Sequence, residues 1–182
     1  MEQENPFKLD VVSIRLVKDA PIYSDREINT PVAAIHLVGE VLCEMDREMV
    51  CVINLKRNNI PVNCNFASIG ALDYAIAQPR EILKSSILSN AAGMLMVHNH
   101  VDGNLLPSKE DIRLTARIQN VAEFVGIPLI DHIIVGGDNR KYFSFHEKGM
   151  IKNPYAVIGM DYENTEKTAG IVVQPEERGV GR

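Results

Sequence analysis

Hydrophobic residues recur along the chain at helical spacing in some segments and at strand spacing in others. Thr30-Pro31 suits a helix N-cap followed by proline at the first helical position, and Val32, Ile35 and Leu42 then follow on one face. Residues 48–55, by contrast, form a short apolar run typical of a strand. On this basis we predict helices over residues 31–44, 79–90 and 108–125, and strands over residues 9–18, 48–55, 60–67, 94–97, 129–135 and 141–145.

The order of these elements indicates the fold class. Strands and helices alternate, which is typical of an α/β fold. Short polar turns at residues 56–59 and 136–139 each separate two predicted strands and so indicate hairpins. We therefore expect an α/β fold with a mixed β-sheet flanked by helices. From about Ile151 onward the chain is polar and lacks periodicity, which predicts a flexible tail over residues 151–182.

Composition narrows the class of protein. The chain has 182 residues, of which 46% are hydrophobic and 24% charged, as in an ordinary globular domain. The net charge of −5 lacks the excess of positive charge that is typical of nucleic-acid-binding domains. Cys43, Cys51 and Cys64 form no Cys-x-x-Cys pair, so neither a disulfide framework nor a cysteine zinc site is indicated. We find no targeting segment and no membrane span, and we expect a cytoplasmic protein.

The strongest chemical signal is His98-Asn99-His100, followed after seven residues by Ser108 and then Asp111. Residues i and i+2 of a strand share a face, so His98 and His100 can point at one atom. Ser108 opens a predicted helix and places Asp111 in its first turn. Two imidazoles and a carboxylate form a three-ligand set that leaves one tetrahedral position open, as in catalytic zinc sites. We predict one zinc ion per chain, bound by His98, His100 and Asp111.

Each half of this pattern also has a simpler interpretation. Ser108 with Asp111 three residues later resembles a capping box, which stabilises a helix start and needs no metal. A lone His-x-His is common without a metal. The combination on a strand end and the next helix start is what favours the metal site, and Ser108 can cap the helix while presenting its hydroxyl to that site.

The spacing H-x-H-x7-S-x2-D resembles the signature of the JAMM (MPN/JAB) metalloprotease domain. The surrounding blocks resemble the RadC-like branch of that family: Pro79-Arg80-Glu81-Ile82, Asn90-Ala91-Ala92, Pro107-Ser108 and the run from Gly126 to Gly136. The resemblance implies a cytidine-deaminase-like sheet flanked by helices. It also implies a RadC-like domain over residues 28–150, preceded by a lead-in over residues 1–27 that contains the early strand. One departure stands out, because Val101-Asp102-Gly103 replaces the family's usual Pro-Ser-Gly.

The resemblance further implies two catalytic residues. The family carries a glutamate at the start of an upstream strand, and Glu48 matches it. The residues alone would not distinguish Glu48 from Glu40, Glu44 or Glu81. A carboxylate beside a zinc-activated water can take up its proton and return it to a leaving amine. Ser108 would donate to the developing oxyanion.

Asp131-His132 lies at the start of the strand that follows the longest predicted helix. A buried, hydrogen-bonded structural pair is one interpretation. The other is that Asp131 or His132 orients a ligand histidine from behind. The sequence does not decide which of the two side chains points inward.

The resemblance therefore implies a zinc-dependent hydrolase of amide bonds that acts on a peptide or an isopeptide-linked protein. Two alternatives stay open: a RadC-like accessory protein of DNA repair or mobile elements, and a scaffold that has lost activity. The acidic net charge argues against direct nucleic-acid binding. Val101-Asp102 keeps the scaffold interpretation open, and the oligomeric state is unknown.

Overall fold

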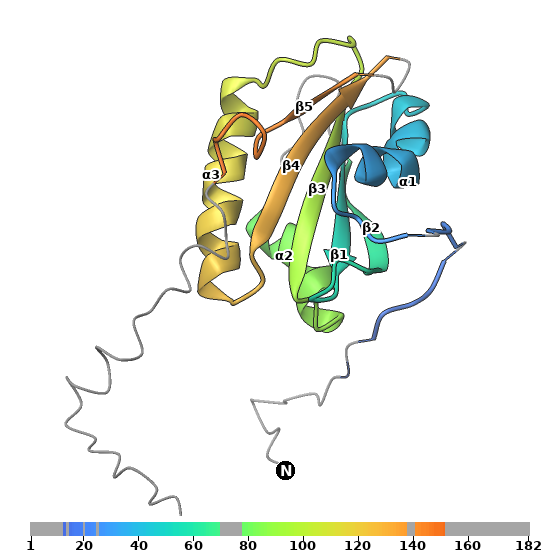
Figure 1. Ribbon diagram of the computed structural model, residues 1–182, viewed down its shortest axis with the longest axis vertical. Coiled ribbons are helices and arrows are strands. Elements are labelled where there is room, and N and C mark those ends of the chain that lie inside the picture. Colours follow the sequence, from blue (N-terminus) through green and yellow to red (C-terminus); the bar gives the residue numbers. More distant parts are fainter. Residues whose placement is uncertain are drawn as a thin grey trace, which may run out of the picture.

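The strands form one mixed sheet in a computed structural model that describes residues 13, 15–19, 21–24, 26–69, 78–137 and 141–151. Its order is β2-β1-β3-β4-β5. Among the described strands, β3 and β4 are the one parallel pair, with α3 as the crossover between them, and the other neighbours are antiparallel (Figure 1). The elements are α1 (Pro31–Cys43), β1 (Met49–Leu55), β2 (Pro61–Ile69), α2 (Pro79–Leu88), β3 (Gly93–His100), α3 (Lys109–Phe124), β4 (Leu129–Gly136) and β5 (Tyr142–Ser144).

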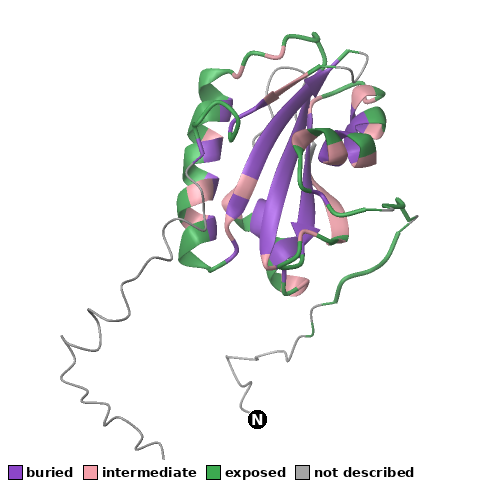
Figure 2. Ribbon diagram, viewed as in Figure 1, coloured by how far each residue is buried: buried purple, intermediate pink, exposed green. Residues whose placement is uncertain are grey.

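Helices cover both faces of the sheet. Residues of α1 pack with alternate residues of the central strands in one hydrophobic cluster, which includes Leu42, Ile53 and Val97. Residues of α2 and α3 pack with the other alternate set in a second cluster, which includes Ile82 and Ile118. β1 and β3 are therefore buried along their whole length (Figure 2). This explains their nearly continuous apolar sequences, since each side of these strands faces a helix.

Local sequence accounts for the helix starts. Thr30 accepts a hydrogen bond from the Ala33 amide at 3.2 Å, and Pro31 stands at the first turn of α1. α2 also begins with a proline, Pro79. α3 ends before Gly126, whose φ of +74° is a left-handed conformation that favours glycine.

The predicted fold class, α/β with a mixed sheet flanked by helices, is confirmed. Most element bounds agree within two residues, but β3 continues through His100 and β5 covers three residues. The early strand is not seen where it can be checked, because residues 13 and 15–18 are in no strand and the rest of 9–18 lies outside the described residues. Ile151, assigned to the tail by its sequence, is buried in the cluster under α2 and α3. Residues 152–182 lie outside the described residues.

Among the described residues, no helix is both long enough and apolar enough to cross a bilayer.

Candidate metal centre

The two histidines of the motif lie at the end of β3, on the face that α3 covers. Their side chains alternate with Asn99 and follow Met94 and Met96 on the same face. His98 is 2% exposed and His100 is 8% exposed. The strand is longer than its apolar run suggested because pairing with β4 continues to the His100–Gly136 pair. The strand geometry therefore brings both imidazoles to one site.

Asp111 reaches these histidines from the first turn of α3. Its Oδ1 lies 3.3 Å from His98 Nδ1, and its Oδ2 lies 3.3 Å from His100 Nε2. A capping box holds this turn, because the Ser108 hydroxyl accepts from the Asp111 amide while Asp111 Oδ2 accepts from the Ser108 amide. The capping and site roles thus coexist in the same residues.

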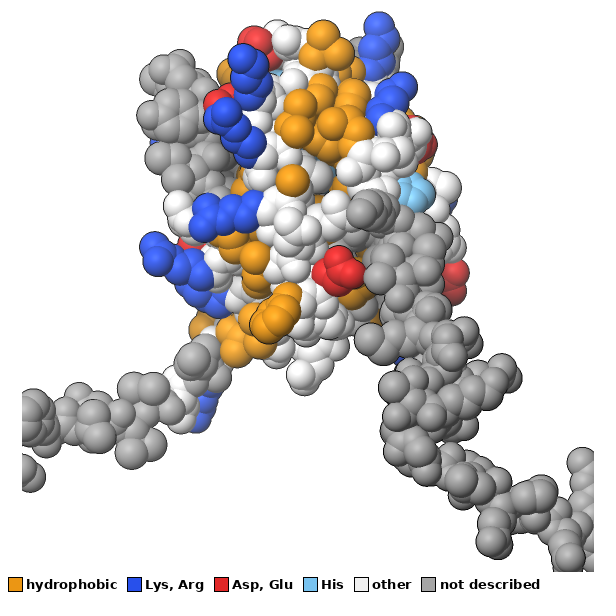
Figure 3. All heavy atoms as spheres, turned by 90° about the vertical axis from the view of Figure 1, so that its left-hand side faces the viewer, with side chains coloured by type: hydrophobic (Ala, Val, Ile, Leu, Met, Phe, Trp, Pro, Cys, Tyr) orange, Lys and Arg blue, Asp and Glu red, His pale blue; other side chains and the backbone are white. Residues whose placement is uncertain are grey.

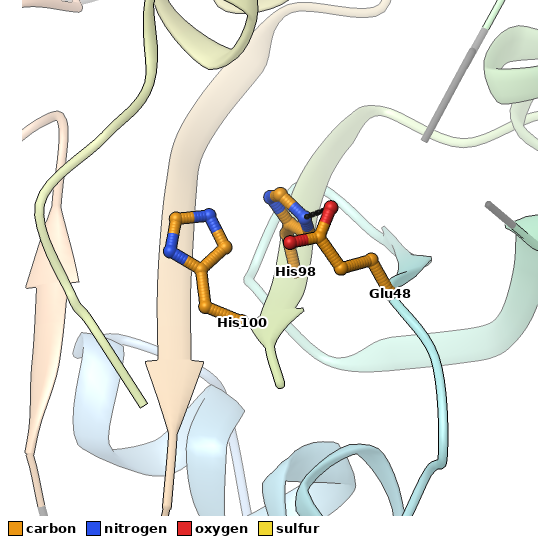
Figure 4. A group of neighbouring side chains, drawn as sticks. All are labelled: Glu48, His98 and His100. Atoms are coloured by element: carbon orange, nitrogen blue, oxygen red, sulfur yellow. Dashed lines mark ion pairs between the residues drawn. The ribbon is translucent and has the colours of Figure 1, made fainter. Parts of the chain in front are cut away.

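Glu48 approaches the same histidine from the opposite side. It directly precedes β1, and the antiparallel pairing of Val50 with His98 brings it to the end of β3. Its Oε2 lies 3.7 Å from His98 Nε2, so the two side chains point toward each other (Figure 4). One donor atom each from Glu48, His98 and His100 lie within 4.8 Å of one another, a group that could hold a metal ion.

The hydrogen bonds of the histidines test whether a cation fits. Among the described residues, neither ring nitrogen of His98 has a hydrogen-bond partner, although the ring is buried. His100 Nδ1 donates to the Asn104 carbonyl, so Nε2 of the neutral ring points a lone pair at the Asp111 carboxylate. Lone pairs facing a carboxylate are stabilised only by a proton or a cation between them. The donor set therefore suits a metal ion.

The contacts between the two histidines and Asp111 also shift the pKa values of these three groups. Burial disfavours the charged form of both histidines, but Asp111 outweighs it and raises the pKa of each, with help from Glu48 at His98 and from the Asn104 carbonyl at His100. Burial also opposes the charged form of Asp111, yet His100, His98 and Ser108 hold the pKa of this carboxyl far below its usual range. The site thus favours positive charge between its carboxylates.

A pocket of about 350 Å³ opens over these residues. It is lined by Glu48, Val50, His98, His100, Asp102, Asn104, Leu106, Pro107, Ser108, Glu110, Asp111 and Leu114. All five residues that the sequence analysis named as ligands or catalytic groups line this one space.

Comparison with known proteins shows the family. Residues 28–150 match the sequence model of the RadC-like JAB domain. The chain belongs to this family. Its relatives include UPF0758 proteins of Clostridium beijerinckii (37% identical over 130 residues, 71% of this chain and 56% of that protein) and Clostridium acetobutylicum (38% over 125 residues, 69% and 54%). A further UPF0758 protein, of Desulfitobacterium hafniense, is 37% identical over 124 residues, 68% of this chain and 54% of that one. The chain thus spans about half the length of the curated relatives that it matches.

In this RadC-like JAB domain, the Ser108 hydroxyl points at a ligand candidate. It donates to Asp111 Oδ2 at 2.7 Å. Its single proton is therefore engaged with Asp111, and donation to an oxyanion would require the hydroxyl to turn away. The predicted oxyanion role of Ser108 stays a prediction, whereas its contact with Asp111 is part of the site.

Of the Asp131-His132 pair, only His132 faces the site. Its Nδ1 lies 2.6 Å from Thr115 Oγ1, and Thr115 in turn donates to the Asp111 carbonyl at 2.6 Å. Because the threonine proton is used on that carbonyl, His132 Nδ1 is the donor to Thr115. Burial and the neighbouring His98 lower the pKa of His132 to about 3, so the ring is neutral. Its plane stacks on His98 with ring centroids 6.0 Å apart.

Asp131 instead joins β4 to the segment around β5. Its carboxylate accepts hydrogen bonds from Ser144 Oγ at 2.6 Å and from the His132 and His146 amides at 2.7 and 2.9 Å. Burial raises its pKa, partly opposed by these donors. These contacts reach none of the histidine rings, so Asp131 acts on the strand pairing. A role of either residue in orienting a ligand stays a prediction.

Two residues at this site were not singled out from the sequence. Thr115, four residues after Asp111, lies one helical turn along α3 on the same side and connects it to His132. Asn99 accepts a hydrogen bond from the Met49 amide at 2.7 Å and donates one to the Arg47 carbonyl at 3.0 Å. It therefore binds the backbone on either side of Glu48. A buried asparagine inside an apolar strand was the available signal for Asn99, because such a group needs partners.

Proposed function

We propose that this chain is a zinc-dependent hydrolase of amide bonds, of the peptidase or isopeptidase type. The observation that carries the proposal is the position of His98, whose buried ring lies between the carboxylates of Glu48 and Asp111. Neither of its ring nitrogens has a hydrogen-bond partner among the described residues. His100 lies beside it in the same pocket. Membership of the RadC-like JAB family supports the same chemistry.

The proposal assigns a role as metal ligand, general base or positioning group to each residue of the site. His98, His100 and Asp111 are the proposed ligands, and a zinc ion there would lower the pKa of a bound water to about 7. Glu48 lines the same pocket from the other side of His98 and is the proposed general base. It accepts the proton of the attacking water and delivers it to the leaving amine. Ser108 holds the Asp111 carboxylate toward the histidines.

The proposed partner is a peptide or an isopeptide-linked protein that enters the pocket over these residues. This proposal concerns the domain alone, because the chain spans about half of its curated relatives. Accessory roles in DNA repair or on mobile elements, and an inactive scaffold, remain predictions from the sequence. No contact described above favours either of them over hydrolysis.

The test loads the chain with zinc and screens it against peptide, isopeptide-linked and DNA substrates. On a cleaved substrate, Glu48→Gln should lower kcat by about 10²- to 10⁴-fold while metal content stays near that of the parent chain, because an amide keeps the shape of the carboxylate but takes up no proton near neutral pH. Glu44→Gln, an exposed glutamate at the end of α1, is the matched control and should behave like the parent chain.

Three outcomes would count against the proposal. Full turnover by Glu48→Gln would show that Glu48 is not the general base. Loss of metal in Glu48→Gln together with retention of metal in Asp111→Asn would make Glu48 the ligand and reverse the two carboxylate roles. Cleavage of DNA and of no peptide would favour the nucleic-acid alternative.

A further inference from the structure

Two more carboxylates stand at the mouth of the pocket, outside the proposed ligands and base. Asp102 belongs to the loop after β3, and Glu110 to the first turn of α3. With Glu48 and Asp111 they bring the carboxylates lining the pocket to four, and no lysine or arginine is among the lining residues. A divalent cation would balance two of these charges, so the mouth keeps an excess of negative charge.

Asp102 is held at this mouth by its loop. The Gly103 amide donates to the His100 carbonyl at 3.1 Å. Gly103 also lies so close to Gly136 that a Cβ on Gly136 would approach the Gly103 Cα to 3.1 Å. Asp102 Oδ1 accepts from the Asn104 amide at 2.9 Å, and among the described residues no cation pairs with this carboxylate.

Glu110 is only loosely compensated. Arg113 Nη1 lies 3.6 Å from its Oε1, and both side chains are mostly exposed, a type of pair that contributes little. Both mouth carboxylates are therefore available to a charged group on a ligand.

Besides these charged groups, the histidines, Asn104 and Ser108, the lining has an apolar part. This part consists of Val50, Leu106, Pro107 and Leu114, of which Leu106 is 69% exposed. Figure 3 shows hydrophobic side chains gathered at the upper end of the face over α3, the end at which this helix begins (Figure 1). A side chain with an aliphatic stem and a cationic head matches an apolar wall that ends in carboxylates.

The state of His98 supports a ligand in this pocket. His98 is buried, lines the pocket, and has no hydrogen-bond partner for either ring nitrogen among the described residues. Buried polar atoms in this state are rare in proteins and need an explanation. The acidic mouth thus surrounds a reactive centre and is more than a solvated patch.

We infer that Asp102 and Glu110 select substrates that carry a lysine or arginine side chain beside the amide bond presented to the site. The inference rests on the proposed hydrolysis and adds the class of its substrate. Electrostatic complementarity of this kind acts mainly on specificity.

The first test compares peptides that differ only in having lysine, norleucine or glutamate next to the scissile bond. Norleucine keeps the aliphatic stem and removes the charge. The ratio of kcat/KM for lysine over norleucine should be about 5- to 10-fold, since each exposed ion pair changes an equilibrium up to about fivefold and two carboxylates act together. In Asp102→Asn combined with Glu110→Gln the ratio should fall to about one to two. Asparagine can still accept the Asn104 hydrogen bond, and Glu123→Gln on the same helix is the control with an unchanged ratio.

The second test needs no turnover. The probes are the blocked amino acids Nα-acetyl-lysine methylamide and Nα-acetyl-norleucine methylamide, added to the zinc-loaded chain and followed by the NMR signals of the His98 and His100 rings. The lysine probe should bind more tightly, and 0.5 M salt should reduce its advantage because salt screens exposed charges.

The outcomes separate the two proposals. Absence of hydrolysis of every peptide overturns the proposed function, while the binding test still decides the selection. Equal binding of both probes overturns the selection whatever the enzyme cleaves. An unchanged preference in the double variant also overturns it, because the charge would then be recognised elsewhere.

Discussion

His98 and Asn99 are neighbours on β3, equally buried, and opposite in their hydrogen bonding. The Asn99 amide is satisfied on both sides by the backbone of Arg47 and Met49. The two nitrogens of His98 have no hydrogen-bond partner in the part of the chain that the structure describes. Alternation along the strand sends the two side chains to opposite faces of the sheet, Asn99 toward α1 and His98 toward α3.

The difference separates a structural polar group from one that suits a ligand. A buried amide whose oxygen and nitrogen both have partners contributes to the stability of the fold without a ligand. A buried imidazole between two carboxylates, with no bond made, is stabilised by a proton or a cation. Asn99 nevertheless contributes to the site, since its two hydrogen bonds fix the backbone segment that carries Glu48.

The largest expected effect is the loss of metal from His98→Ala. Removing the buried imidazole takes away the centre of the donor set, so the purified variant should hold almost no zinc, whereas the parent chain should hold about one ion. Elemental analysis measures this. His36→Ala, an exposed histidine of α1, is the control. An equal metal content in the parent chain and in His98→Ala would show that His98 is not a metal ligand.

A smaller effect on metal binding is expected at Thr115, which contacts the backbone of the proposed ligand Asp111. Thr115→Val keeps the shape of the side chain but breaks the connection between His132 and the Asp111 carbonyl. Loss of such outer contacts typically lowers metal affinity about 10- to 100-fold. Competition with a chelator gives the affinity, and Thr115→Ser should restore it because the hydroxyl returns. An affinity equal to that of the parent chain in Thr115→Val would show that the network is only structural.

Asn99→Ala should affect stability first. It leaves the Met49 amide and the Arg47 carbonyl without partners, which should lower the free energy of unfolding by about 1–3 kcal/mol. Urea unfolding of the metal-free chain measures the change, with the exposed Asn58→Ala as control. Metal content of the folded variant should stay near that of the parent chain. If Asn99→Ala loses metal as His98→Ala does, the distinction between the two neighbours is wrong.

Local pattern was sufficient for most elements, and the exceptions have physical reasons. The strand predicted over 94–97 extends to His100 because its polar end is buried by pairing with β4, which periodicity of hydrophobic residues does not reveal. Ile151 is buried although a polar segment follows it, because its burial depends on a distant core under α2 and α3.

The spacing of His98, His100 and Asp111 by itself determined that two imidazoles and a carboxylate would meet, since a strand end and the next helix start lie within one short loop. Only the tertiary structure decided which glutamate joins them. Glu48 is fifty residues away from His98 in the chain, and the register of β1 against β3, with Val50 opposite His98, brings it there. The same register is what lets Asn99 hold the backbone around Glu48. Contacts within a turn follow from local geometry, whereas contacts across a sheet depend on strand pairing, which no short stretch of sequence encodes.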